Sequence, residues 1–145
     1  MRRILAAVIA AVALAVVFTE AGHAAGGATV KTRSGKLGTY LVDAKGRTLY
    51  LFEKDKTRKS RCSGACAVAW PPLLTAGKPK AAGSAKASLL STSKRSDGKT
   101  QVTYHGHPLY FFVQDKKAGD TKGQNVDAFG AEWYVLSPSG KKIDG

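Results

Sequence analysis

The chain has 145 residues, and 23 lysine and arginine residues against 10 aspartate and glutamate residues give it a net charge of +13 at pH 7. This length is enough for one small domain with a buried core. The positive charge is spread over lysine-rich loops, which favours an anionic partner, with an ordinary solvated surface as the alternative. The sequence contains no serine-hydrolase elbow, no zinc-protease helix motif and no phosphate-binding loop, which argues against those enzyme classes.

Residues 1–24 have the pattern of a secretory signal peptide. Arg2 and Arg3 precede an apolar run over residues 4–18, and Gly22-His23-Ala24 fits a cleavage site before Ala25. A membrane span needs about 20 apolar residues, so we expect cleavage, with no membrane span afterwards, rather than an anchor. No cysteine lies near the cut, and lipid attachment is therefore not expected.

Cleavage predicts a periplasmic or secreted mature chain of 121 residues. Removing Arg2, Arg3 and Glu20 leaves 21 basic and 9 acidic residues and a net charge of +12. Export takes the protein away from nucleic acid, and no nucleic-acid-binding motif is present. The expected partner is an anionic envelope component or an acidic protein.

The mature chain begins with residues 25–36, which are rich in Gly, Lys and Thr and predict a flexible segment or an edge strand. Residues 37–43 and 47–53 predict two strands joined at Lys45-Gly46, where the glycine can adopt a positive φ. A basic loop follows up to Arg61 and is expected to be solvated. These elements belong to a first repeat over residues 37–74.

Cys62 and Cys66 are the only cysteines of the chain. An isolated pair in an oxidising compartment predicts a disulfide. It would hold a short helix near residues 63–70, and Trp70 would end that helix because the residue before a proline avoids the α conformation.

A second repeat is expected after a low-complexity segment. Residues 75–88 lack aromatic side chains and predict a mobile linker. The Asp97-Gly98 turn is the strongest hairpin signal of the chain. Further along, the predicted segments are strands over 89–94, 100–104 and 132–137, a polar loop over 116–128, a second repeat spanning 89–137 and a basic tail over 138–145.

Two stretches of fourteen residues, 42–55 and 102–115, can be aligned with six identities. In each copy the residues after the turn alternate, so that Leu49 and Leu51 share one face of the strand and Tyr50 and Phe52 share the other. Both faces are apolar, which predicts central strands covered on both sides. We therefore expect a mainly β fold, with two hairpin repeats packed pseudo-symmetrically on one core. The identities are Val42/Val102, Gly46/Gly106, Leu49/Leu109, Tyr50/Tyr110, Phe52/Phe112 and Asp55/Asp115.

This pattern resembles a bacterial secreted-repeat family, often described as predicted lipoproteins, that carries a Tyr-x4-Asp motif. Further matching pieces are Cys62-Ser-Gly-Ala-Cys66, Trp70-Pro-Pro72 and Gly106-His-Pro-Leu-Tyr110. The resemblance covers roughly residues 37–137 and implies export and a repeated β-rich domain. It implies no established activity, and the absence of a lipid-attachment cysteine departs from the family description.

The motif residues Tyr50, Asp55, Tyr110 and Asp115 are the first candidates for a functional site. An offset of five residues would put Tyr and Asp on opposite sides of a regular strand. We therefore expect the strand to end first, each Asp to accept backbone N–H bonds in the turn that follows, and each Tyr to bury its ring.

His105 and His107 are the second candidates, because they are the only histidines of the mature chain. With reduced Cys62 and Cys66 they would form a set that binds copper(I) or zinc. The neighbouring Arg61 and other cations would lower the thiol pKa and favour exchange. The sequence thus predicts a non-catalytic envelope-binding or interaction module without a cofactor, with a periplasmic metal or thiol-redox carrier as the alternative.

Overall fold

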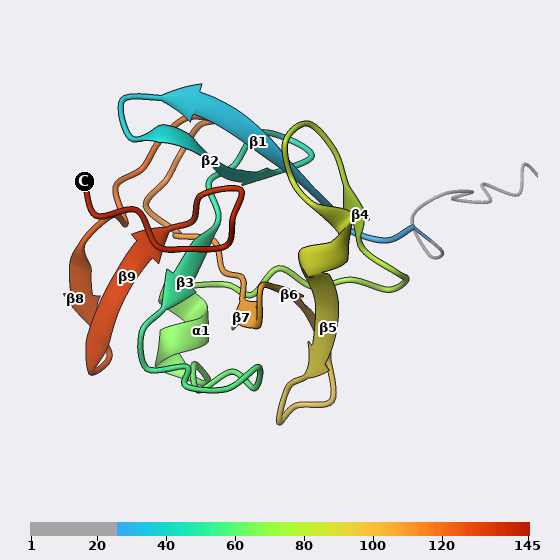
Figure 1. The fold of residues 1–145 in the computed structure, drawn as a ribbon. Coiled ribbons are helices and arrows are strands. Elements are labelled where there is room, and N and C mark those ends of the chain that lie inside the picture. The colour runs from blue at the N-terminus through green and yellow to red at the C-terminus, as the bar shows by residue number, and fades with distance from the viewer. Residues whose placement is uncertain (1–25) are drawn as a thin grey trace, which may run out of the picture.

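The computed structural model describes residues 26–145, which fold into three small sheets with a short α-helix and one turn of 3-10 helix (Figure 1). The prediction of a mainly β fold is confirmed. The strand orders are β2-β1-β4, β3-β9-β8 and β5-β6-β7. The elements are β1 Thr29–Gly35, β2 Gly38–Asp43, β3 Tyr50–Phe52, α1 Ala65–Ala69, β4 Lys80–Ala81, η1 Ala87–Leu89, β5 Leu90–Lys94, β6 Thr100–Tyr104, β7 His107–Pro108, β8 Val126–Ala128 and β9 Ala131–Val135.

The two repeats meet at equivalent tyrosines. The backbone N–H of Tyr50 donates to the carbonyl of Tyr110 at 2.8 Å, and the N–H of Tyr110 donates to the carbonyl of Tyr50 at 3.0 Å. An antiparallel pair between equivalent residues places a pseudo-twofold axis between them. The repeats therefore pack on one another as predicted.

The strand β3 is covered on both faces, as its alternation predicts. Leu49 and Leu51 belong to one buried cluster. Tyr50 and Phe52 belong to the other. In the second repeat Leu109 lies in the first of these clusters, and Tyr110 and Phe112 lie in the second. The alternating side chains of β3 and of residues 109–112 in the second repeat thus build the two halves of the core.

The turns of the two repeats differ by one residue. His105 and Gly106, with φ of 50° and 80°, form a two-residue turn between Tyr104 and His107. In the first repeat the N–H of Asp43 donates to the carbonyl of Arg47, which leaves a three-residue loop that ends at Gly46 with φ of 84°. Only the second turn is the two-residue type that a residue before glycine favours.

This extra residue shifts the alignment of the preceding strands. The N–H of Val102 donates to Leu73, and its carbonyl accepts from Leu109. In the first repeat Leu41, not Val42, makes the corresponding bonds with Leu136 and Leu49. The identity of Val42 and Val102 in the sequence therefore does not reflect equivalent positions in the fold.

Two segments are more ordered than predicted. Within residues 25–36, β1 is the middle strand of its sheet, neither a flexible start nor an edge strand. Within residues 75–88, expected as a mobile linker, β4 pairs in parallel with β1, and the N–H of Ala82 donates to Val30 at 2.9 Å. Val30 is fully buried, so the packing of one side chain and the pairing of the backbone hold both segments in place.

The centre of the core is a stack of four aromatic rings in the order Phe52, Trp133, Trp70 and Phe112. Successive ring centroids are 4.0, 3.9 and 4.0 Å apart, with interplanar angles of 6°, 4° and 17°. Edge-on contacts flank the stack, with Tyr50 at 5.4 Å from Trp70 and Tyr110 at 5.1 Å from Trp133. Each tryptophan thus lies between two aromatic rings of the other repeat, and the stack holds the two repeats together.

Gly123 closes the edge of this aromatic stack, where a Cβ atom would lie 2.8 Å from the rings of both Trp70 and Tyr50. These rings are held on every side, so Gly123→Ala is expected to cost about 1–3 kcal/mol of unfolding free energy. Urea denaturation measures this loss. Gly35→Ala is the matched control, because its Cβ would meet only Tyr40 at 3.4 Å. Equal stabilities of the two variants would contradict the close packing at Gly123.

Candidate functional site

The two Tyr-x4-Asp motifs bond to each other rather than within themselves. The hydroxyl of Tyr50 donates to Oδ2 of Asp115 at 2.6 Å. The hydroxyl of Tyr110 donates to Oδ2 of Asp55, also at 2.6 Å. We call these two contacts the crossed latches. Each latch joins the tyrosine of one repeat to the aspartate of the other.

The five-residue spacing follows from a turn between the aromatic residues and the aspartate of each motif. The N–H of Asp55 donates to the carbonyl of Phe52, and the N–H of Asp115 donates to that of Phe112, both at 3.0 Å. As expected from the sequence, the strand ends before the aspartate. The turn then brings the carboxylate back toward the tyrosine of the other repeat.

The second oxygen of each carboxylate holds the loop that follows. Oδ1 of Asp55 accepts the N–H of Arg61 at 2.6 Å, and Oδ1 of Asp115 accepts the N–H of Lys122 at 2.9 Å. The sequence predicts that each aspartate accepts backbone N–H bonds from the turn directly after it. The observed donors are backbone N–H groups, but they lie 6 and 7 residues further along the chain. Each aspartate therefore ties a tyrosine and a distant loop residue to one point.

Burial governs the ionisation of all four motif residues. It raises the pKa of Tyr50 and Tyr110, and the neighbouring carboxylates raise both further. Burial also raises the pKa of Asp55 and Asp115, against the opposing effect of the tyrosine hydroxyls that donate to them. The tyrosines therefore remain neutral donors, which suits a structural bond better than proton transfer.

Three polar residues not identified from the sequence extend the Tyr110–Asp55 latch. The Tyr110 hydroxyl is also 2.7 Å from Oγ of Ser60. Nη1 of the buried Arg95 donates to that Oγ at 3.1 Å and to Oε1 of Gln101 at 2.7 Å. Arg95 precedes the Asp97-Gly98 turn, where a solvated cation is the usual expectation, so no sequence signal marks it as buried.

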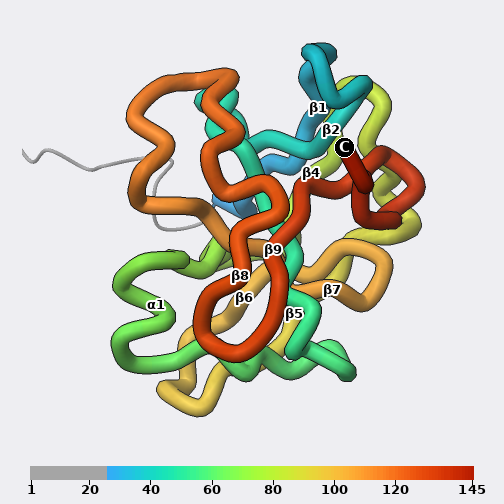
Figure 2. The backbone as a smooth tube through the Cα atoms, turned by 90° about the vertical axis from the view of Figure 1, so that its left-hand side faces the viewer, coloured from blue at the N-terminus to red at the C-terminus, as the bar shows by residue number. Residues whose placement is uncertain are grey.

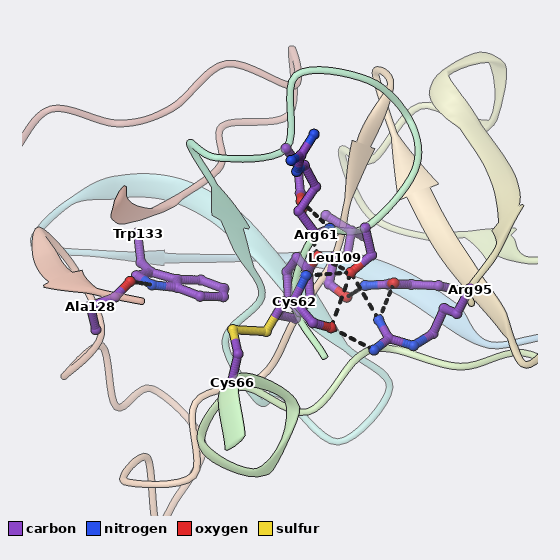
Figure 3. Close-up of a disulfide and its surroundings, with 11 residues drawn as sticks. Arg61, Cys62, Cys66, Arg95, Leu109, Ala128 and Trp133 are labelled. Atoms are coloured by element: carbon purple, nitrogen blue, oxygen red, sulfur yellow. Dashed lines mark hydrogen bonds between the residues drawn. A yellow bond between two sulfur atoms is a disulfide. The ribbon is translucent and has the colours of Figure 1, made fainter. Parts of the chain in front are cut away.

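Cys62 and Cys66 form a disulfide, which confirms the predicted pair, and the helix that it holds, Ala65–Ala69, lies within the predicted range (Figure 3). Both residues are buried. Arg95 lies on one side of the disulfide and donates from Nη2 to the carbonyl of Cys62 at 2.7 Å, while Trp133 lies on the other (Figure 3). Its burial and its oxidised state make this disulfide a structural element rather than an exposed exchange site.

The structure does not assemble the metal set of Cys62, Cys66, His105 and His107. The cysteines are bonded to each other, and the two imidazole centroids are 6.4 Å apart. Over residues 26–145, no cluster of three or more His, Cys, Asp or Glu side chains is placed to hold a metal ion. Burial and the charge of His105 lower the pKa of His107.

The loop over residues 54–61, which we call the first basic loop, exposes five cations. Its one acidic residue, Asp55, is turned inward to the latch. Over residues 26–145, no salt bridge includes any of the five cations. A surface cavity of about 410 Å³ opens here and is lined by cations and hydroxyls without a carboxylate: Lys54, Thr57, Lys59, Ser60, Arg61 and Ser63.

The corresponding loop of the second repeat, residues 116–122, is the second basic loop. It exposes Lys116, Lys117 and Lys122, and none of them is in a salt bridge within the part of the chain that the structure describes. Oδ2 of Asp120 accepts the N–H groups of Lys116 and Lys117 at 2.9 and 3.2 Å. Each latch is thus followed by a loop that is ordered by a carboxylate and rich in free cations.

Comparison with known proteins places the chain in a family. A family model described as a secreted repeat of unknown function matches residues 31–74 and again residues 91–137. Searches of curated proteins and of solved structures found no match. None of the helices within residues 26–145 has the length and apolar character needed to cross a membrane. The predicted signal peptide lies outside the described residues, but the predicted export agrees with the family, and the chain belongs to this family of secreted repeats.

Proposed function

We propose that this protein is a non-catalytic binding module that acts outside the cytoplasm and attaches to an anionic component of the cell envelope. The observation that carries the proposal is the first basic loop, where five exposed cations have no salt bridge among the described residues and the only carboxylate is turned inward. Unpaired cations at one place attract anions and raise their local concentration.

The loop is held in place before any ligand arrives. Its two ends are fixed by the Tyr110–Asp55 latch, the Asp55–Arg61 bond and the Cys62–Cys66 disulfide. A loop that is already ordered loses little conformational entropy on binding, so more of the interaction energy appears as affinity. In this proposal the motif residues Asp55 and Tyr110 have a structural role, because they hold the first basic loop in the conformation that binds the anion.

The test compares the binding of fluorescently labelled long-chain inorganic polyphosphate to the wild type and to two charge-reversal variants. Lys59→Glu with Arg61→Glu changes two residues that line the cavity. Lys80→Glu with Lys86→Glu is the control, since it makes the same change in net charge at exposed residues that line neither this cavity nor the second basic loop.

We expect the first variant to bind at least about tenfold more weakly and the control to lose less than about threefold, because charges close to the ligand contribute most. Wild-type affinity should also fall as salt is raised from 50 to 300 mM. If both variants lose the same affinity for polyphosphate, binding depends only on the net charge of the protein and not on the first basic loop, which would contradict the proposal. If the protein binds an acidic protein tightly and does not bind polyphosphate, its partner is an acidic protein rather than an anionic envelope component, and the proposal is contradicted.

A further inference from the structure

We infer that the molecule has a second anion-binding cavity on its opposite side and bridges two segments of a phosphate-bearing polymer. This inference rests on the proposed function and adds a second site. The second cavity, of about 300 Å³, lies beside the second basic loop and again has cations and hydroxyls without a carboxylate. Its lining is Arg33, Ser34, Gly35, Lys36, Leu37, Tyr40, Gly119 and Thr121.

The chemistry of the second cavity matches that of the first. Arg33 and Lys36 are exposed, and neither is in a salt bridge within residues 26–145. The Arg33 guanidinium lies close over Gly119, where a Cβ atom would be 3.1 Å from Nη2. The glycine thus leaves room for the cation at the cavity, next to the hydroxyls of Ser34 and Thr121.

The pseudo-twofold axis relates the surroundings of the two basic loops. A Cβ atom on Gly106, in the turn of the second repeat, would lie 3.8 Å from Cγ of Arg58 in the first basic loop. A Cβ atom on Gly46, in the turn of the first repeat, would lie 3.1 Å from Cβ of Ala118 in the second basic loop. Each loop therefore packs on the hairpin turn of the other repeat, which gives the two loops related places in the fold. The cations of the second cavity come from another element, the β1–β2 hairpin, while the second basic loop contributes Gly119 and Thr121 to its wall.

Figures 1 and 2 show where these sites lie. In both views the second basic loop is at the top, near β1 and β2, and the first basic loop is at the bottom, beyond β3. Sites on opposite sides of a small rigid domain cannot both rest on one flat membrane. A flexible polymer can reach both, and two polymer chains can each occupy one.

The lining groups favour phosphate as the recognised unit. A phosphate offers several acceptor oxygens around one centre, so that ammonium, guanidinium and hydroxyl donors can approach it from different directions. A carboxylate offers only two oxygens, both in one plane, and can therefore accept hydrogen bonds from fewer of these donors. A polymer with a phosphate in every unit can also engage both sites at once, which strengthens overall binding by raising the effective concentration at the second site.

The experiment has two parts, both on the mature chain. Titration calorimetry with tripolyphosphate counts the sites, and light scattering with long-chain polyphosphate detects cross-linked assemblies. The first site is removed by Lys59→Glu with Arg61→Glu and the second by Arg33→Glu with Lys36→Glu, with Lys80→Glu and Lys86→Glu as the control. Circular dichroism melting confirms that each variant folds.

We expect two tripolyphosphate equivalents for the wild type and the control, and one for each site variant. Long polyphosphate should form large assemblies with the wild type and the control, whereas either site variant should bind it without assembly. One equivalent in the wild type, or assembly that survives the loss of either site, would overturn the bridging inference and leave the proposed function standing. If the wild type binds neither polyphosphate nor anionic phospholipid vesicles, both the bridging inference and the proposed function are contradicted. Clustering of anionic phospholipid vesicles with no response to polyphosphate would assign the phosphate to lipid and contradict a polymer ligand.

Discussion

Replacing Trp133 by alanine is expected to destabilise the protein by about 3–5 kcal/mol, a large part of the total stability of a domain of this size. Trp133 is fully buried and lies in the middle of the aromatic stack, between Phe52 and Trp70. Its removal would leave a cavity, separate these two neighbours, and free the carbonyl of Ala128 from its indole N–H donor. Urea denaturation followed by circular dichroism measures the loss.

Trp70→Ala provides an internal comparison, because Trp70 has the equivalent place between Trp133 and Phe112. Its loss should match that of Trp133→Ala within about 1 kcal/mol, since the two side chains are fully buried and similarly stacked. Phe129→Ala is the control for aromatic truncation, as Phe129 is 43% exposed. A loss below about 1 kcal/mol in either tryptophan variant would mean that the stack does not hold the repeats together.

Asp55→Ala is expected to cost about 2–3 kcal/mol, in the range for hydrogen bonds to a charged group. It would leave the N–H of Arg61 and one bond of the Tyr110 hydroxyl without an acceptor. Asp115→Ala should cost less, because Asp115 is more exposed than Asp55 and water can replace its carboxylate. Asp127→Ala, at an exposed residue of β8, is the control and should change stability by less than about 0.5 kcal/mol.

The pH dependence of Asp55→Ala follows from the pKa of Asp55. Burial raises this pKa in the folded protein above the ordinary value of 3.8, so the folded state takes up the proton first as the pH falls. The advantage of the wild type over Asp55→Ala should therefore grow as the pH falls through the folded-state pKa, and be complete below the unfolded value. An advantage that disappears in acid would contradict a raised pKa.

The sequence predicts the individual secondary-structure elements of the fold better than it predicts which elements pair with one another. Alternation along residues 49–52 correctly predicts which side chains share a face, and the spacing of Cys62 and Cys66 correctly predicts the disulfide and its helix. Both signals are local, since they depend on strand period and on residues a few positions apart. The N-terminal strand β1 has no such signal, because Val30 is its only buried residue.

The crossing of the latches could not be derived from one sequence. A repeated motif shows that Tyr50 and Tyr110 are equivalent, but a tyrosine can bond to the aspartate of its own repeat or to that of the other. The backbone hydrogen bonds between Tyr50 and Tyr110 place each tyrosine beside the aspartate of the other repeat. This pairing is a tertiary contact between residues sixty positions apart, which a single sequence does not reveal. Each repeat contains a single tryptophan, and this pattern is the sequence signal for the stacked pair Trp70 and Trp133.

The measurement that tests the crossed latches most directly is a pair of double-mutant cycles. One combines Tyr110→Phe with Asp55→Ala, and the other combines Tyr110→Phe with Asp115→Ala, with unfolding free energies from urea denaturation. The crossed pair should show a coupling of at least about 1 kcal/mol and the pair within one motif less than about 0.5 kcal/mol. Coupling within the motif and none across the repeats would contradict the crossed arrangement.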